Sequence, residues 1–274
     1  MRRLDLSVLR GTHQRSASRV ATTHRLVYPA LLATPSLEVA VPTYAAEPGP
    51  ALAEVVLTGV RSPNRLGVVS AIGCTLLIGV YAAILVAGMS SLESQQQPIG
   101  DPFFSLLEII IIVLAPLMVV LMGAVHAWAP IEAKASTLLA VVFAGLLAGV
   151  TCSVHTVILL VGRHAAASGV AGLPMFFSFA WPSVPYALDI LAWDVFFALA
   201  VLFAAPAFSE RGLASWIRAL LIGSGALALA GLAGIATGDM GLRIIGVVGY
   251  VGVFPVATVL MAILFHRAIP RETS

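Results

Sequence analysis

Residues 103–128 read FFSLLEIIIIVLAPLMVVLMGAVHAW, a stretch in which Glu108 is the one acidic side chain and Lys and Arg do not occur. A transmembrane helix needs about 20 predominantly apolar residues, because each residue rises about 1.5 Å and the hydrocarbon layer is about 30 Å thick. The stretch is long enough to cross a bilayer, and it is too long and too evenly apolar for a β-strand. It predicts a membrane-spanning α-helix.

Five further stretches share this character, so the sequence predicts an all-α integral membrane protein, a bundle of six transmembrane helices. The expected spans are Leu66–Met89, Phe103–Trp128, Ala135–Val161, Val184–Phe208, Leu213–Gly238 and Met240–Phe265. Of the 274 residues, 59% are hydrophobic and 10% are charged, whereas soluble domains carry about 25% charged residues. Mean hydropathy is +1.01. This composition excludes a cytosolic enzyme and a disordered protein.

Residues 1–65 differ from this pattern, since they are rich in Arg and Ser at the start and carry repeated prolines between Pro29 and Pro50. Prolines at that spacing prevent a long helix. We expect a basic, poorly ordered arm and linker, with an organellar transit peptide, a lipid contact and sequence upstream of the true start as alternatives. The membrane domain is expected over 66–268 and a short tail over 269–274.

Basic residues near the span ends are unevenly distributed. One side has Arg61, Arg65, Lys134, Arg211, Arg218, Arg267 and Arg271, and the other has Arg163 and Arg243. Because Lys and Arg stay on the cytoplasmic side, both termini are expected there, with connections 90–102, 162–183 and 239–241 outside. The aromatic stretch GLPMFFSFAWPS (172–183) predicts an interfacial belt, with a re-entrant lid as the alternative. The Arg and Ala content favours a bacterial cytoplasmic membrane.

Ionisable side chains within a bilayer are costly and ordinarily face protein or a water-filled cavity. Counting about 1.5 Å per residue from the outer span ends, Glu108 and Asp189 lie roughly 7 Å deep and His155 roughly 9 Å deep. Asp194 lies roughly 15 Å deep, near the midplane, and Arg243 stands near the start of the sixth span. A regular helix would point Asp194 about 140° away from Asp189, which predicts a different neighbour for each.

Tyr186 and Trp193 share a helix face with Asp189. We therefore expect an outward-facing polar pocket, and the candidate residues for ion or proton binding are Glu108, His155, Asp189, Asp194, Tyr186, Trp193 and Arg243. Such groups can hold a cation or relay protons. Glu108, His155 and Asp189 are also candidate ligands for a metal whose identity they do not fix. The alternative is an ion-pair network that fixes helix packing, in which Arg243 neutralises Glu108 or Asp189.

Two weaker patterns concern the arrangement of the spans. Residues 105–110, 186–191 and 240–245 align without gaps and place a charged residue at the same position, which suggests a duplicated helical hairpin. The sixth span carries Gly246, Gly249 and Gly252 before Pro255, which indicates a bend there, because proline lacks a backbone donor.

These features give three hypotheses for function. The first is a small secondary transporter or channel-like protein for protons, cations or a small polar solute. The second is a non-catalytic subunit or scaffold of a larger membrane complex, and the third is a membrane metal-binding or redox protein. Cofactors stay unknown, and the absence of nucleotide-binding, hydrolase or protease signatures disfavours an enzyme. We expect the lipid bilayer as partner, a homo-oligomer or complex partner as an open alternative, and no nucleic acid, since the net charge is only +2.

Overall fold

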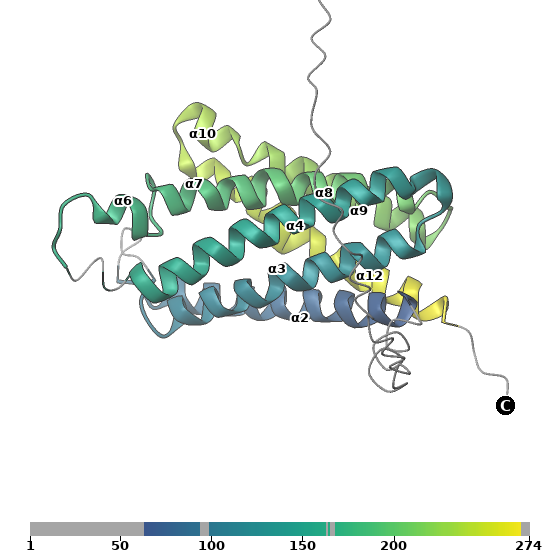
Figure 1. Ribbon diagram of the computed structural model, residues 1–274, viewed down its shortest axis with the longest axis horizontal. Coiled ribbons are helices and arrows are strands. Elements are labelled where there is room, and N and C mark those ends of the chain that lie inside the picture. The colour runs from purple at the N-terminus through teal and green to yellow at the C-terminus, as the bar shows by residue number, and fades with distance from the viewer. Residues whose placement is uncertain (1–62, 94–98, 163, 165–167, 270–274) are drawn as a thin grey trace, which may run out of the picture. The chain divides into compact units, whose positions relative to one another are not determined.

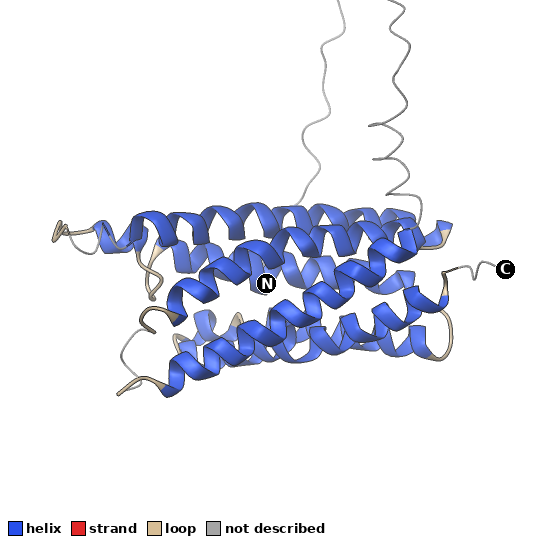
Figure 2. Cartoon of the chain, turned by 90° about the horizontal axis from the view of Figure 1, so that it is seen from below, coloured by secondary structure: helices blue, strands red, loops and turns tan. Residues whose placement is uncertain are grey.

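The computed structural model describes residues 63–93, 99–162, 164 and 168–269, so the predicted arm and tail lie almost wholly outside the described residues. The described part consists of helices joined by loops and turns and contains no strand (Figures 1 and 2). The helices long and apolar enough to cross a membrane cover Pro63–Ser90, Phe103–Trp128, Ile131–Gly162, Val184–Ala207, Leu213–Thr237 and Met240–Arg267. These six agree with the six predicted spans to within a few residues, and they confirm an all-α integral membrane protein.

The first two spans are single helices, and the later ones are composed of shorter segments. The first two are α2 (Pro63–Ser90) and α3 (Phe103–Trp128). The third joins η1 (Ile131–Ala133), α4 (Lys134–Val157) and η2 (Ile158–Gly162). The fourth follows the short α6 (Leu173–Phe177) and joins α7 (Val184–Ile190), η3 (Leu191–Phe196), α8 (Phe197–Ala204) and η4 (Ala205–Ala207). The fifth is α9 (Leu213–Ala230) with α10 (Ala233–Thr237), and the sixth joins η5 (Met240–Arg243), α11 (Ile244–Val247), η6 (Val248–Val253) and α12 (Phe254–Arg267).

The six spans form a closed ring in which neighbours along the chain are neighbours in space. Contacts run from α2 to α3, from α3 to α4, from α4 to α8 and from α8 to α9. The sixth span then closes the ring, because α12 contacts both α9 and α2. Short connections between long helices produce this up-and-down arrangement. Fully buried side chains such as Met118, Leu147 and Phe197 fill its interior.

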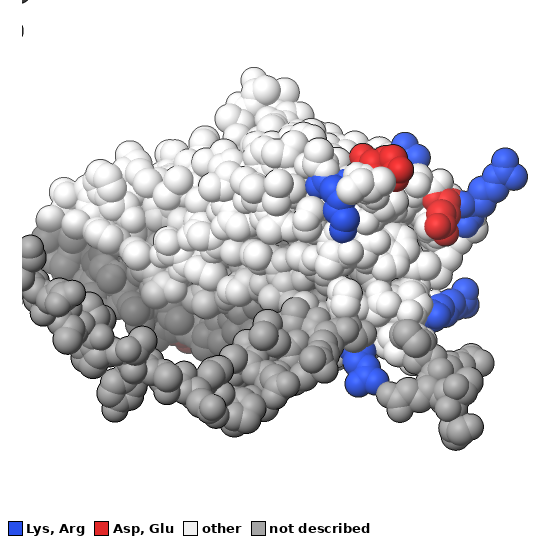
Figure 3. Space-filling model, turned by 45° about the vertical axis from the view of Figure 1, so that its right-hand side comes forward, with Lys and Arg blue, Asp and Glu red and all other residues white. Residues whose placement is uncertain are grey.

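The outside of the bundle is apolar, as expected for a surface in contact with lipid tails. Val69, Leu76 and Leu160 have exposed fractions of 67%, 62% and 64%. Figure 3 shows Lys and Arg side chains gathered toward one end, with acidic side chains among them. We call this the basic end. The side-chain amide of Asn64 donates to the carbonyl of Ala268 at 2.9 Å, so the first and last described helices both reach that end.

Three segments depart from the regular α-helix assumed from the sequence. η2, η3 and η6 are π-helical, so their backbone hydrogen bonds join residues five apart and each turn takes up an extra residue. In the sixth span, the π-helical segment η6 lies where the sequence predicted a bend. Pro255 lies in the first turn of α12, which follows η6. Single-turn π segments occur frequently at functional sites.

Candidate functional site

Five charged or ionisable side chains from four spans form one continuous chain of contacts, which we call the buried ion cluster. His155 on α4 lies between two carboxylates: its Nδ1 is 2.7 Å from Glu108 Oε2 on α3, and its Nε2 is 3.4 Å from Asp189 Oδ1 on α7. Arg243 on η5 continues the chain, with Nη2 3.7 Å from Asp189 Oδ2 and 3.1 Å from Asp194 Oδ2. Its Nε also donates to Asp194 Oδ2 at 3.2 Å. The predicted shared layer of Glu108, His155 and Asp189 therefore corresponds to direct contacts.

The buried ion cluster carries more negative than positive groups. All five of its residues are buried, and Asp194 has an exposed fraction of 0%. Three carboxylates face the guanidinium of Arg243 and the imidazole of His155, so ionised carboxylates would outnumber the cations even with a protonated imidazole. A buried charge is strongly disfavoured unless it is paired. The excess negative charge of the cluster is therefore balanced by a proton on a carboxyl group or by a bound cation.

The prediction that Asp189 and Asp194 would meet different neighbours is wrong, because both contact Arg243. Asp194 lies in η3, whose widened turns take up the extra residue and bring side chains five apart closer to one face. Gly246 makes room for the pair, since a Cβ at that position would lie 2.7 Å from Asp194 Oδ1. The expected pairing of Arg243 with Glu108 or Asp189 is correct only for Asp189, which is the more distant of its two carboxylate partners.

Tyr186 packs against the arginine of the cluster. The guanidinium carbon of Arg243 lies 4.9 Å from the centre of the Tyr186 ring, a cation–π arrangement. Ser183 fixes the start of α7 by accepting a hydrogen bond from the Tyr186 backbone amide at 3.2 Å. This cap sets the position of Tyr186 and, one turn later, of Asp189 on the same helix face.

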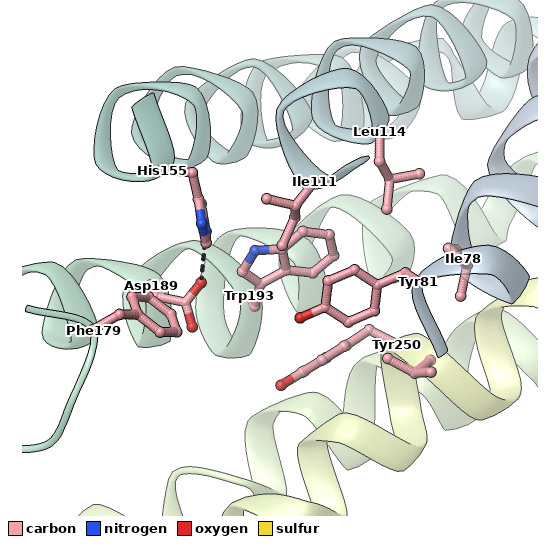
Figure 4. Close-up of a pocket in the computed structure, with 10 residues that line it drawn as sticks. Ile78, Tyr81, Ile111, Leu114, His155, Phe179, Asp189, Trp193 and Tyr250 are labelled. Carbon is pink, nitrogen blue, oxygen red and sulfur yellow. Dashed lines mark ion pairs between the residues drawn. The ribbon is translucent and has the colours of Figure 1, made fainter. Parts of the chain in front are cut away.

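A pocket of ≈ 70 Å³, which we call the central pocket, lies beside the cluster in the interior of the bundle. Its walls combine aliphatic side chains from α2 and α3 with a group of aromatic and ionisable residues: Tyr81, His155, Phe179, Asp189, Trp193 and Tyr250. Figure 4 shows these side chains converging from several helices, with the ion pair between His155 and Asp189 at one side. About 10–15 Å³ of such space suffices for one water molecule, so the pocket has room for a small solute.

A second cavity of ≈ 470 Å³, the outer pocket, adjoins the central pocket. The two share Tyr81, Ile111, His155 and Phe179 in their walls, and Glu108 lines only the outer one. The outer pocket reaches the end of the bundle opposite the basic end, where Ile99 and the segment 177–180 contribute to its wall. His155 thus stands between the two cavities.

The aromatic stretch 172–183 contributes to both predicted arrangements. Phe176 and Trp181 are exposed, as in an interfacial belt. Phe179 instead packs against His155, with ring centres 5.3 Å apart, and lines both pockets. Part of this connection therefore reaches inward and covers the site.

Several polar atoms near the cluster are buried without a hydrogen-bond partner among the described residues. They are Thr151 Oγ1, His155 Nε2, Trp193 Nε1 and Asp194 Oδ1. Buried polar atoms in folded proteins are nearly always bonded to protein or to ordered water. Because His155 and Trp193 line the central pocket, a polar occupant of that pocket would supply partners at this point.

The proposed metal ligands Glu108, His155 and Asp189 lie together, but their contacts do not resemble a coordination shell. Both ring nitrogens of His155 face carboxylates, whereas a metal-bound imidazole directs one nitrogen to the ion and the other to a second partner. Within the described ranges, no group of three or more His, Cys, Asp or Glu side chains has an arrangement that could hold a metal ion.

The central pocket also contains three residues that were not predicted from the sequence: Tyr81, Phe179 and Tyr250. Tyr81 could have been noticed from the sequence, because it is the one aromatic residue of the first span and brings a hydroxyl group into a helix that is largely apolar. Tyr250 similarly brings a hydroxyl group into the glycine-rich part of the sixth span. Phe179 carried no comparable signal, since the surrounding stretch is aromatic throughout.

Comparisons with protein-family models, curated proteins and solved structures find no match to this chain. Its function is therefore inferred from the geometry and chemistry of the site.

Proposed function

We propose that this chain is a small secondary transporter or channel-like protein that moves protons or small cations by way of the buried ion cluster. The excess of three carboxylates over one guanidinium and one imidazole, beside two connected pockets, carries this proposal. Ionisable groups at membrane depth mark ion pathways and proton relays when they face a cavity. A cluster built only for helix packing would need neither the charge excess nor the cavities.

The positions of the residues suggest distinct roles in such a pathway. Glu108 lines the outer pocket and Asp189 the central pocket, with His155 between them. An imidazole can accept a proton at one nitrogen and release one from the other, so His155 is suited to connect the two carboxylates. Arg243 compensates part of the negative charge and sets the resting charge of the cluster, and Asp194 holds Arg243 in place.

The basic end supports an orientation for this pathway. Because Lys and Arg are retained on the cytoplasmic side, the basic end would face the cytoplasm and the outer pocket the opposite side. We accordingly propose that both termini are cytoplasmic and that the protein belongs to a bacterial cytoplasmic membrane. Protons or cations would then enter the cluster from outside through Glu108.

The proposal is tested by flux into liposomes that contain the purified full chain and a pH-sensitive dye. We expect Glu108→Gln and Asp189→Asn to lower the proton flux driven by a membrane potential by about 100-fold. The matched control is Glu132→Gln, which removes an exposed carboxylate at the opposite end of the bundle. Thermal melting of each variant separates loss of flux from loss of folding.

The scaffold hypothesis makes the opposite prediction, and one observation favours it: each charged side chain of the cluster has a charged partner. Buried ion networks can serve helix packing alone. Under that hypothesis, Glu108→Gln and Asp189→Asn lower the melting temperature, and wild-type and variant liposomes show the same flux of protons and of small cations as protein-free liposomes. That result would overturn the transport proposal.

A further inference from the structure

The central pocket has the wall chemistry of a site for a cation that aromatic rings attract. Four aromatic side chains line it: Tyr81, Phe179, Trp193 and Tyr250. The faces of aromatic rings carry partial negative charge and attract ammonium groups, most strongly at Trp and Tyr. The rings of Trp193 and Tyr250 support each other, with centres 5.4 Å apart and an interplanar angle of 49°. Their faces are therefore held in a fixed arrangement.

One wall of this pocket also carries a carboxylate, that of Asp189, whose two ion-pair partners are comparatively distant. The oxygens of Asp189 lie 3.4 Å from His155 Nε2 and 3.7 Å from Arg243 Nη2, beyond the usual length of a charge-assisted hydrogen bond. They therefore retain capacity to accept hydrogen bonds from an occupant. Cavities with low-dielectric walls and charge of one sign concentrate ions of the opposite sign. The occupant that these walls favour is a cation.

Hydrogen-bond acceptors stand around the same space. In the part of the chain that the structure describes, His155 Nε2 has no hydrogen-bond partner, although the exposed fraction of the residue is only 3%. Neutral His155 that donates from Nδ1 to Glu108 presents Nε2 as an acceptor. Figure 4 shows the hydroxyl groups of Tyr81 and Tyr250 pointing from the far wall toward the side where Asp189 lies. A primary ammonium group has three donors, which suits several acceptors converging from different walls.

The size of the pocket limits the cation. A cavity of about 150 Å³ accommodates benzene, and the central pocket has about half that volume, ≈ 70 Å³. Ammonium or methylammonium fits this space, whereas a tetraalkylammonium ion is larger and has no N–H donor. The aliphatic side chains of Ile78, Ile111 and Leu114 offer a surface for a single methyl group.

We propose that the central pocket binds a small primary ammonium ion, of the size of ammonium or methylammonium, as the cation that the protein carries. This inference rests on the proposed function, because it names the substrate class of the same site. Asp189, His155 Nε2 and the tyrosine hydroxyls accept from the ammonium group, and the rings of Trp193 and Tyr250 hold the rest of the ion.

The test is calorimetric titration of the purified full chain with methylammonium chloride at constant ionic strength. We expect saturable binding that ammonium chloride displaces, and no saturable binding of methanol or tetramethylammonium chloride. The double variant Tyr81→Phe, Tyr250→Phe keeps both rings and removes both hydroxyls, so affinity should fall about tenfold. Trp216→Phe, an exposed aromatic on α9, is the matched control and should bind as the wild type does.

Proton flux measured in amine-free buffer distinguishes the two proposals. Wild-type flux without saturable methylammonium binding overturns the ammonium proposal and leaves the proposed function standing. Binding of methylammonium without flux of either protons or methylammonium into liposomes overturns transport and identifies an ammonium-binding membrane protein. Equal binding of methylammonium, methanol and tetramethylammonium would show that neither charge nor size is selected, which also overturns the ammonium proposal.

Discussion

The two halves of the bundle achieve helix packing by different means. The half nearer the basic end, which we call the basic half, packs aromatic and aliphatic side chains, with Trp128 stacked on Phe208 at 5.3 Å and edge-on to Phe265 at 5.9 Å. The other half, which we call the cluster half, holds the buried ion cluster, both site pockets and Phe179. Apolar contacts can be exchanged at modest cost, whereas buried charges require specific partners. Under the proposed function, the basic half maintains the fold and the cluster half carries ion transport.

Loss of Arg243 is the change with the largest expected effect on stability. Arg243→Leu leaves Asp194 buried and unpaired, and removal of one partner from a buried pair costs about 3–5 kcal/mol. The free energy of unfolding in detergent micelles should fall by that amount. The control Arg218→Leu removes an exposed cation on α9 and should change stability by less than about 0.5 kcal/mol. Adding Asp194→Asn to Arg243→Leu should restore part of the loss. Equal stability of Arg243→Leu and wild type would refute the view that the cluster needs its cation.

A smaller effect is expected where the fifth and sixth spans meet. A Cβ at Gly249 would lie 2.7 Å from the carbonyl oxygen of Ser224 and 3.0 Å from the amide nitrogen of Ala228, both backbone atoms that cannot turn aside. Gly249→Ala should therefore force the helices apart and destabilise the protein by about 1–3 kcal/mol. Gly223→Ala on α9 meets nothing within 4 Å and should be neutral or stabilising, since alanine favours helix. If chemical unfolding showed that both variants change the free energy of unfolding in the same direction, close backbone contact at Gly249 would be contradicted.

The smallest effect is expected from the polar contact between the first and last spans. Thr75 Oγ1 and Thr258 Oγ1 lie 2.8 Å apart and join α2 to α12. Hydrogen bonds between membrane helices contribute about 0.6 kcal/mol on average, so Thr75→Val should cost about that much. Thr258 keeps its hydrogen bond to the carbonyl of Pro255, so no buried group is left unpaired. A double-mutant cycle with Thr258→Val measures the coupling energy between the two hydroxyl groups. A coupling energy above about 2 kcal/mol would contradict the view that this contact stabilises the bundle much less than the buried ion cluster does.

The fold was predictable because each span is marked by its own composition, independently of the others. The layer that holds Glu108, His155 and Asp189 was predictable for a related reason: the rise per residue fixes depth once the span ends are known. The direction in which each side chain points around its helix axis was not predictable. Asp194 joined the cluster because η3 is π-helical, and that departure depends on packing against neighbouring spans, which local composition does not encode.

The residues that line the central pocket were also not predictable from the composition of single spans. Tyr81 and Tyr250 belong to the first and last spans, and they become neighbours of one cavity only because the ring of helices closes. The aligned segments at 105–110, 186–191 and 240–245 place Glu108, Asp189 and Arg243 at one sequence position, and all three enter the cluster. Duplication of a hairpin stays a hypothesis, since shared depth alone would also bring these charges to one level.

The π-helical turn at Leu191–Phe196 has a consequence for how sequences of this architecture can diverge. Loss of a single codon between Asp189 and Asp194 would let the span return to a regular helix with almost the same hydropathy. It would leave the two carboxylates four residues apart, on one face of that helix. If the same residues instead returned to a regular helix without a deletion, the residues on either side of the turn would rotate by about 100° relative to each other. Asp189 and Asp194 could then no longer share Arg243. Two chains with indistinguishable hydropathy profiles can thus differ in whether they possess the site at all, and a one-residue alignment gap at this turn is the change that keeps the two carboxylates together.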